Sequence, residues 1–376
     1  MFGVRNHLLI IPASVCASVT AARITAQTPG AVALPNQHGC SQIGADYDMT
    51  WRTLVGFGRN PNVGAVLVVG LGCEGLEPDK LAEAIAADGK PVEYLVIQRL
   101  GGTLKTIAAG TEIAGRMSRR LAAQKKREMP LSSLVLGLEC GGSDPTSGLA
   151  ANPVIGFASA KMVDSGGSSI LSETTEVIGA EHLLAERFQD PEDRRKFMEM
   201  VKRTEKRAID LGVDLRQGQP TPGNKAGGIS TIEEKSLGCM YKAGDSPFVG
   251  VLEYAEPLPP HKKGLYFMDS PGQDIDSISG MTASGAQIIA FSTGRGTPTG
   301  SPICPVVKIT GNQKTYENMI DNIDINAGDL IDGRQTLAEI GQGLFDFILE
   351  VADGRLTKAE SLGHQEFGIF KLAGTF

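Results

Sequence analysis

Residues 134–144 read LVLGLECGGSD, an apolar run that ends in a turn rich in glycine, acid and thiol. A short, continuous apolar run followed by glycines is typical of a buried strand in a parallel sheet, with polar residues at its carboxyl end. The stretch VLVVGLGCEG at 66–75 has the same form. Together they predict an α/β protein whose polar turns meet at one edge of a sheet.

Outward from these stretches, the chain alternates strands, glycine-rich turns and helices. Apolar runs predict strands at 7–11, 65–69, 93–97, 134–138, 169–171, 248–254, 265–268, 287–291 and 305–309. Helical periodicity is clearest over 103–128, 180–211 and 336–352. The segment 214–230 has prolines and glutamines but few apolar residues, so we expect a long loop there.

The polar stretch LAAQKKREMP at 121–130 is the expected domain boundary. A chain of 376 residues favours two domains over one hydrophobic core. We therefore expect an N-terminal α/β domain over 1–130 and a second α/β domain over 131–376.

Charge and composition exclude several classes of function. The net charge is −7 and there is no basic stripe, so the sequence offers no electrostatic case for nucleic acid. We find no apolar stretch long enough to span a membrane. The six cysteines are far apart and form no CxxC pair, which favours a reducing, cytoplasmic setting. Arg5 and the apolar run from Leu8 imitate a signal peptide, but Pro12 interrupts the run and a buried strand is preferred.

Turns with carboxylates or thiols follow predicted strands at 72–75, 139–144, 173–176 and 269–274. Carboxylates gathered at one sheet edge repel one another unless a cation or a proton compensates. A mixed supply of carboxylate, thiolate and imidazole suits iron(II), manganese or zinc better than calcium. The alternative is that these residues cap helices and form turns. The expected metal ligands are Glu139, Cys140, Glu173 and Glu176.

His38 and Cys40 stand two residues apart in a glycine loop. His38 is a candidate general base, and the pair could also ligate a metal or simply form a hydrogen-bonded turn. Glu74 and Lys235 complete the expected catalytic set. The stretch 70–75 also matches the dinucleotide pattern GxGxxG, but the next strand ends without an acidic residue, which argues against NAD.

Other residues are candidates for binding an anionic substrate. The turn STGRGT at 292–297 combines exposed backbone N–H groups with Arg295, a natural cradle for a carboxylate. Asn224, Lys105, Ser143 and Asp144 complete the expected substrate-binding set.

These segments, in this order, resemble the altronate and galactarate dehydratase family. The similarity covers nearly the whole chain, and the ordered set is far more specific than any single motif. The matching segments are GVRN (3–6), HGC (38–40), GLGCEG (70–75), GGTLKT (101–106), GLECGGSD (137–144), LSETTE (171–176), GAEHLL (179–184), TIEEKSLG (231–238), PGQDI (271–275), TGRGTP (293–298) and NIDINAG (322–328).

The resemblance implies more than the residues alone. It implies a C-terminal domain that is a Rossmann-like parallel sheet with a chain crossover, and an N-terminal domain that dimerises. It implies a divalent metal, Fe(2+) with Mn(2+) as the alternative, and a small hydroxy-acid substrate. Family members carry a small β-clip domain before this region, so we expect a separate β-clip subunit as partner in a homodimer or heteromer.

The family chemistry begins when a base removes the proton on carbon 2, beside the substrate carboxylate. The resulting anion needs a metal and nearby cations, and the substituent on carbon 3 then leaves. The leading expectation is a hydro-lyase that acts on a sugar acid such as D-altronate. The alternatives are the large subunit of a (2R)-sulfolactate sulfo-lyase and a non-catalytic binding or scaffold subunit.

Overall fold

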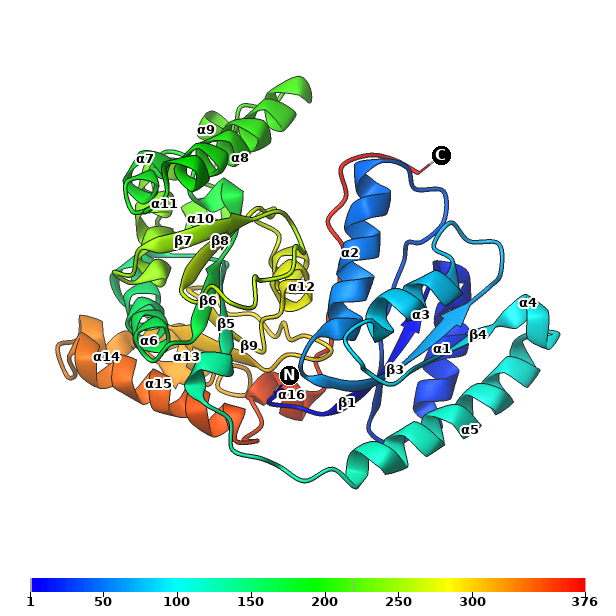
Figure 1. Ribbon diagram of the computed structural model, residues 1–376. Coiled ribbons are helices and arrows are strands. Elements are labelled where there is room, and N and C mark those ends of the chain that lie inside the picture. Colours follow the sequence, from blue (N-terminus) through cyan, green and yellow to red (C-terminus); the bar gives the residue numbers. More distant parts are fainter. Residues whose placement is uncertain (1, 219, 376) are drawn as a thin grey trace.

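The computed structural model describes residues 2–218 and 220–375, which form two parallel β-sheets flanked by helices. Figure 1 shows the two sheets side by side, each within its own group of helices. The first sheet has the order β2-β1-β3-β4, and all its pairings are parallel. Its strands are β1 His7–Pro12, β2 Ala31–Ala33, β3 Val63–Gly70 and β4 Val92–Val96. We call this sheet with its helices the N-terminal unit.

Helices cover both faces of the first sheet. On one face, α1 and α5 pack against the apolar side chains of β1 and β3. On the other face lie α2 and α3, and α2 also packs against α12 of the second unit. This two-sided cover explains why β1 and β3 are continuous apolar runs rather than alternating ones. The helices are α1 Val15–Ala26, α2 Ala45–Arg59, α3 Pro78–Ala86, α4 Ile97–Leu100 and α5 Thr103–Ala122.

The second sheet has seven parallel strands in the order β11-β10-β9-β5-β6-β8-β7. The chain starts at β5, continues to β6, passes to the edge strand β7 and returns to β8 between β6 and β7. It then crosses to β9 on the other side of β5. The order therefore reverses at β5. The strands are β5 Val135–Gly141, β6 Ser168–Leu171, β7 Phe248–Leu252, β8 Leu265–Met268, β9 Ile288–Thr293, β10 Val306–Thr310 and β11 Ile325–Asn326.

The second sheet is also covered on both faces, and with its helices it forms the C-terminal unit. One face packs against α6, α8 and α15, and the other faces α12 and the N-terminal unit. The helices are α6 Asn152–Asp164, α7 Glu181–Ala185, α8 Pro191–Asp210, α9 Leu215–Gly218, α10 Pro222–Gly227, α11 Ile232–Met240, α12 Asp274–Ser284, α13 Gln313–Asn318, α14 Gly328–Ile331, α15 Leu337–Ala352 and α16 Lys358–Leu362.

The α/β class is confirmed, and every strand that the sequence predicts is present within a few residues. The strands that the sequence analysis missed, β2 and β11, are short. The Rossmann-like crossover stays a prediction. In the described part of the chain, no helix combines the length and the hydropathy needed to cross a bilayer.

Three expected elements are wrong in extent. The helix predicted to reach Glu128 ends at Ala122, because the charged residues that follow have no apolar face to bury. The helix predicted over 180–211 is broken into α7 and α8. At the break, the chain at Phe188 pairs with the edge strand β7, and Asp190 and Pro191 then start α8.

The predicted loop over 214–230 is also wrong in part, because it contains the short helices α9 and α10. Helix α10 begins with residues that are typical of a helix N-terminus. Thr221 is its N-cap, with its side chain accepting from Asn224 N, and Pro222 occupies the first turn.

The two units are joined by polar and aromatic contacts. Asp46, at the start of α2, accepts hydrogen bonds from Leu372 N at 2.6 Å and Ala373 N at 2.9 Å. Phe57 on the same helix makes an edge-to-face contact with Phe367. Figure 1 shows this C-terminal segment, in red, running back along α2. The end of the chain thus ties the C-terminal unit to the N-terminal one.

Arg5 makes a second tie from the opposite end of the chain. Its guanidinium forms a bidentate pair with Glu360 of α16, at 2.7 and 2.9 Å. It also donates to the carbonyl oxygens of Val351 and Arg355. The side chains of Arg5 and Glu360 are 10% and 18% exposed, so this pair is screened less than an ordinary surface ion pair.

Replacing Arg5 with methionine should therefore destabilise the protein by roughly 2 to 4 kcal/mol, because it removes the cation that faces the Glu360 carboxylate and the hydrogen bonds to three carbonyl oxygens. The shift of the urea unfolding midpoint measures this change. Arg334→Met is the matched control, since Arg334 pairs with Asp329 and Asp332 on the surface and should cost under about 1 kcal/mol. Equal shifts for both variants would contradict the role given to Arg5.

Candidate active site

A buried group of acids, thiols and lysines lies where the strand order of the second sheet reverses. Ligands in open α/β sheets bind at the carboxyl ends of strands, at such a reversal. Glu139 and Cys140 end β5, and Glu173 and Glu176 follow β6. All four side chains are buried, with exposures of 0 to 6%. We call this group, with the two lysines, the second cysteine and Asp274 described below, the acid–thiol cluster.

Two thiols and one carboxylate are in contact at its centre. Cys140 Sγ lies 3.4 Å from Cys239 Sγ, and Cys239 Sγ lies 3.4 Å from Glu176 Oε2. The ligand atoms of these three residues all lie within 4.8 Å of one another. Two sulfurs and one carboxylate oxygen form a donor set suited to a borderline divalent metal. Three protein ligands with a further position free for substrate are typical of a catalytic metal site.

Helix α11 contributes the second thiol of this group, and a cation, from one face. Lys235 and Cys239 stand four residues apart, and Lys242 follows three residues later in the turn Tyr241–Ala243. Residues at this spacing share one side of a helix. Thr231 fixes the start of α11, because its side chain accepts from Glu234 N.

Two buried lysines face the carboxylates. Lys235 Nζ lies 2.7 Å from Glu176 Oε1, and Lys242 Nζ lies 2.5 Å from Glu173 Oε2. Burial alone would lower the pKa of Lys235, but the adjacent Glu176 carboxylate outweighs it and the net shift is upward. Burial likewise opposes the charge on Lys242, but Cys140 and Glu173 raise its pKa well above the usual value. Both side chains are therefore cations at neutral pH.

The carboxylates still exceed the lysines. Asp274, at the start of α12, joins Glu139, Glu173 and Glu176 in this electrostatic group, so four acids face two ammonium groups. Burial and then the Glu173 charge raise the pKa of Glu139 well above its usual value. Burial, Glu173 and Glu176 raise the pKa of Asp274 to about 7. A bound cation would relieve the same excess of negative charge.

Two carboxylate oxygens have no hydrogen-bond partner within residues 2–218 and 220–375. Glu139 Oε2 accepts from Ser277 Oγ at 2.6 Å, but its Oε1 is buried without a partner. Glu173 Oε2 accepts from Cys140 N and Lys242 Nζ, but its Oε1 is likewise alone. Buried, unsatisfied oxygens are costly unless something binds them. They point to a ligand at this site.

Backbone geometry holds the cluster in place. Glu173 has a φ of 71°, a left-handed conformation that a non-glycine residue rarely adopts. Its N–H donates to Ser270 Oγ at 2.8 Å, and Thr174 Oγ1 donates to Asp269 Oδ1. A Cβ at Gly141 would lie 2.3 Å from an Asp274 oxygen, so glycine is required for this close approach.

The expected substrate-binding residues of the C-terminal unit also meet at this sheet edge. Asn224 Nδ2 donates to Ser143 O at 2.8 Å, and Arg295 Nη1 donates to Gly223 O at 3.0 Å. Arg295 N also donates to Gly142 O at 2.9 Å, so the turns after β5 and β9 touch. Asp144 accepts from Asn312, Thr146 and Ser147. The structure thus brings Ser143, Asp144, Asn224 and Arg295 together. Ser143 and Asp144 follow Cys140 closely in the chain.

The candidates of the N-terminal unit lie elsewhere. His38 is half-buried, and burial followed by the nearby Lys371 lowers its pKa. Cys40 is exposed, and Glu74 accepts hydrogen bonds from the backbone N–H groups of Leu71 and Gly72 in its own loop. Among the described residues, no hydrogen bond or ion pair links these side chains to the acid–thiol cluster.

Lys105 is the most remote of the proposed substrate-binding residues. It is exposed in the first turn of α5. Figure 1 shows α4 and the start of α5 at the outer end of the N-terminal unit, away from the second sheet. Within one chain, the structure therefore does not bring Lys105 to the cluster.

The sequence analysis missed three members of the cluster. Cys239 and Lys242 follow Lys235 at helical spacing, and that spacing was the available signal. Asp274 lies within the quoted turn 269–274, but nothing in that turn distinguishes it from an ordinary N-terminal acid of a helix.

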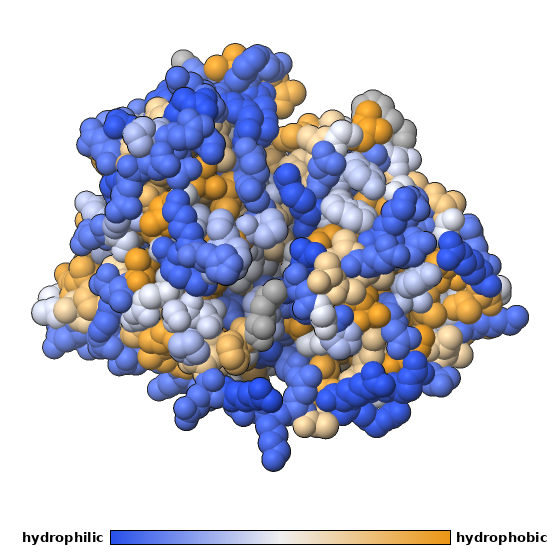
Figure 2. All heavy atoms as spheres, in the orientation of Figure 1, coloured by the Kyte–Doolittle hydropathy of each residue, from blue (hydrophilic) through white to orange (hydrophobic). Residues whose placement is uncertain are grey.

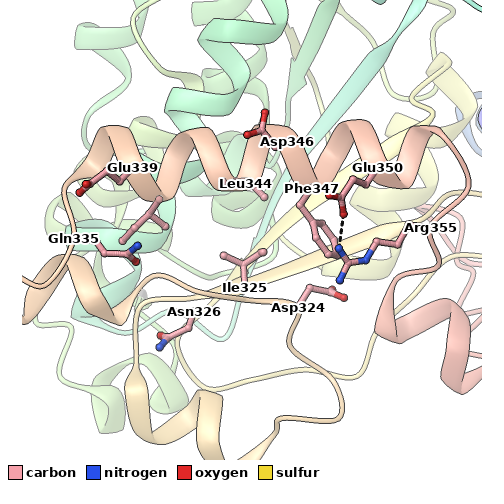
Figure 3. Close-up of a pocket in the computed structure, with 12 residues that line it drawn as sticks. Asp324, Ile325, Asn326, Gln335, Glu339, Leu344, Asp346, Phe347, Glu350 and Arg355 are labelled. Carbon is pink, nitrogen blue, oxygen red and sulfur yellow. Dashed lines mark hydrogen bonds and ion pairs between the residues drawn. The ribbon is translucent and has the colours of Figure 1, made fainter.

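A cavity of about 350 Å³ lies under α15 at the edge strand β11 and does not include the cluster (Figure 3). Several of its charged side chains already have partners. Glu339 caps α15, Glu350 pairs with Arg355, and Asp324 accepts from the backbone of Lys308 and Lys358. This arrangement serves the fold rather than catalysis.

Two family models match the chain, one over each unit. The family model described as D-galactarate/altronate dehydratase, C-terminal, matches residues 131–375. The model for the second domain of D-galactarate dehydratase/altronate hydrolase matches residues 1–122.

Three relatives illustrate the similarity. The chain is 38% identical to (2R)-sulfolactate sulfo-lyase subunit beta of Chromohalobacter salexigens, over 98% of this chain and 94% of that protein. It is 37% identical to altronate dehydratase of Bacillus subtilis, over 98% of this chain and 75% of that protein. It is 36% identical to galactarate dehydratase (L-threo-forming) of Escherichia coli, over 86% and 63%. These names confirm the expected family and the expected enzyme class, a lyase. The chain belongs to the D-galactarate/altronate dehydratase family.

Proposed function

We propose that this chain is a hydro-lyase that removes water from carbon 3 of a sugar acid such as D-altronate, giving a 2-dehydro-3-deoxy acid. The acid–thiol cluster is the observation that carries the proposal. It combines cations, unsatisfied carboxylate oxygens and thiols in a buried group at the sheet edge where ligands of α/β proteins bind. A scaffold subunit would have no need to bury such groups.

A divalent metal, Fe(2+) or alternatively Mn(2+), fits the donors at the centre of the cluster. Cys140, Cys239 and Glu176 would hold it, because their ligand atoms already lie within 4.8 Å of one another. When bound, the metal would supply a Lewis acid that stabilises negative charge on the substrate. Glu139 and Glu173, which the sequence also proposes as ligands, each offer a buried oxygen without a hydrogen-bond partner in the described chain.

The lysines fit the charge that develops in the reaction. Removing the proton on carbon 2 places a second negative charge on the substrate carboxylate, and this anion limits the rate unless cations face it. Lys235 and Lys242 are buried and positively charged, so they act at low dielectric and need no reorganisation. Arg295 would hold the substrate carboxylate at the rim of the site.

The proton acceptor must be uncharged or anionic at the working pH. Lys235 and Lys242 are cations and cannot serve. His38 fits the requirement, because its lowered pKa keeps the imidazole neutral at pH 7. We therefore keep His38 as the proposed base, on a loop of the N-terminal unit that has no hydrogen bond or ion pair to the acid–thiol cluster among the described residues, and Cys40 and Glu74 stay in the proposed catalytic set.

A second candidate function is supported by one relative. The chain matches sulfolactate sulfo-lyase subunit beta over 94% of that protein at 38% identity. Sulfite leaves more readily than water, so the same cations and base would suffice without a strong general acid. In either case we propose that the chain works with a separate β-clip subunit and as part of a homodimer or heteromer in the cytoplasm.

Product analysis tests the proposed reaction. The iron-loaded protein, assayed without oxygen and with or without a β-clip subunit, should convert altronate or galactarate to a 2-oxo acid without releasing sulfite. Sulfite together with pyruvate from sulfolactate would establish the second candidate instead. Turnover of none of the three acids under any of these conditions would favour the scaffold.

Replacing Cys239 with serine should weaken metal binding and turnover together. The loss should be at least the roughly 10- to 100-fold that follows removal of an outer-shell partner of a metal. Cobalt(II) is a direct probe, because a thiolate ligand gives it a charge-transfer band that the variant should reduce. Cys16→Ser, at an exposed position on α1, is the matched control and should leave the band unchanged. An unaltered band in Cys239→Ser would remove this residue from the ligand set.

Replacing His38 with glutamine should lower kcat by roughly 10²- to 10⁴-fold. A base works when unprotonated, so the wild-type rate should rise with pH through the pKa of His38. Because burial and Lys371 lower that pKa, the midpoint should lie below 6.5, and the variant should lack this limb. His261→Gln, an exposed position, is the control. An unchanged profile in His38→Gln would exclude His38 as the base.

A further inference from the structure

A second cavity of about 490 Å³ lies between the two units, apart from the acid–thiol cluster. One wall is the second half of α2, from Trp51 to Arg59, with Asn60 after it. The other wall includes the end of α12 and the loop 255–263. Figure 2 shows this face of the molecule hollowed between its two halves. A volume in this range is typical of sites for small molecules. We call it the interunit cavity.

The lining is mainly apolar, which sets it apart from a sugar-acid site. Apolar side chains come from both units, and several are partly exposed although they pack on the shared core. A sugar acid carries hydroxyl groups along its whole length and would leave them unpaired here. The apolar lining residues include Phe2, Trp51, Val55, Pro257, Leu258 and Pro260.

The backbone around the cavity is already satisfied. Asn60 Nδ2 donates to Thr282 O and Ala286 O, both at 2.8 Å. Gln287 Nε2 donates to Phe2 O at 2.6 Å. Leu258 N donates to Ser284 O at 2.9 Å. These hydrogen bonds hold the two units together around the cavity. The charged side chains that line the cavity are the groups left to contact a ligand.

Those charged side chains are mostly basic. Arg52, Arg59 and Lys263 line the cavity with a single carboxylate, Asp88, so positive charge exceeds negative by two. Arg59 is engaged by Asp88 at 3.5 Å and by Ala84 O at 3.0 Å. Arg52 Nε, in contrast, is buried and has no hydrogen-bond partner among the described residues. Arg52 also forms no ion pair with a described residue, so the part of its guanidinium that lines the cavity is available to an anion.

We propose that the interunit cavity binds a small carboxylate with an apolar, ring-sized body. The carboxylate would accept from Arg52, and the body would pack against Trp51, Val55 and Leu258. Because its walls come from both units, the ligand would bind the folded arrangement of the two and raise its stability. This inference does not depend on the proposed lyase reaction.

Trp51 provides the test, since it is the single tryptophan of the chain. Phenylacetate is the probe, and phenylacetamide is the neutral analogue of the same shape. We expect a saturable change of Trp51 emission with phenylacetate, a higher melting temperature in its presence, and binding of phenylacetamide at least tenfold weaker. A response that does not saturate, or equal binding of the two compounds, would overturn the proposal.

Two variants separate binding from folding. Arg52→Met keeps the apolar stem and removes the charge, so phenylacetate should bind at least tenfold more weakly while the far-ultraviolet circular dichroism is unchanged. Val55→Phe should fill the cavity and abolish binding. Arg120→Met, at an exposed position on α5, is the matched control and should bind as the wild type does. If Arg52→Met bound phenylacetate as tightly as the wild type does, Arg52 would not be the group that binds the carboxylate, and the proposal would be overturned.

Two further outcomes would also overturn it. Displacement of phenylacetate by altronate would make the cavity part of the substrate site. Sedimentation velocity tests the other occupant, a second copy of this chain. If Arg52→Met or Val55→Phe dissociates an oligomer, and phenylacetate gives no signal in the intact one, the cavity is an interface between copies.

Discussion

Burial of charge at the carboxyl ends of β5 and β6 is the constraint on which the rest of the C-terminal unit depends. Carboxylates are stable in such a place only when cations face them or when they hold protons. The fold supplies Lys235 and Lys242 from the region of α11, each within ion-pair distance of a glutamate. This pairing of buried carboxylates with cations depends on the position of α11. It also depends on the left-handed backbone of Glu173 and on the glycine at 141. Buried charges and a strained backbone destabilise a fold, and a ligand that binds them accounts for their presence here.

The two sheets have different parts in this arrangement. The second sheet places the acid–thiol cluster and the loops with Ser143, Asn224 and Arg295 on one edge, because all of its strands run parallel. The first sheet holds His38, Cys40 and Glu74 on loops of its own. Under the proposed reaction, the base and the cations therefore belong to different units. The ties made by Arg5 and Asp46 set how the two units meet.

Three buried cysteines show how environment decides chemistry. Cys304 Sγ donates to Ala286 O at 3.0 Å, and burial raises the pKa of its thiol to about 12, so it behaves as a core residue. Cys140 and Cys239 are equally buried but touch each other and Glu176. The hydrogen bond with Cys239, followed by burial, raises the pKa of Cys140 well above its usual value. The raised pKa favours the protonated thiol of Cys140. A bound metal would instead favour the thiolate, because the thiolate is the form of cysteine that ligates metals.

The sequence by itself determined the α/β class, the main strands, the family and the acidic turns after β5 and β6, because buried parallel strands are continuous apolar runs and the motifs lie in a specific order. It did not determine where helices stop, as at Ala122 and Ala185, since those ends depend on what surface remains to be buried and on pairings such as that of Phe188 with β7. Only the tertiary structure decided that Cys239 and Lys242 join Cys140 while Lys105 stays apart. Helical spacing says which residues share a face, but the packing of α11 on the sheet decides what that face meets.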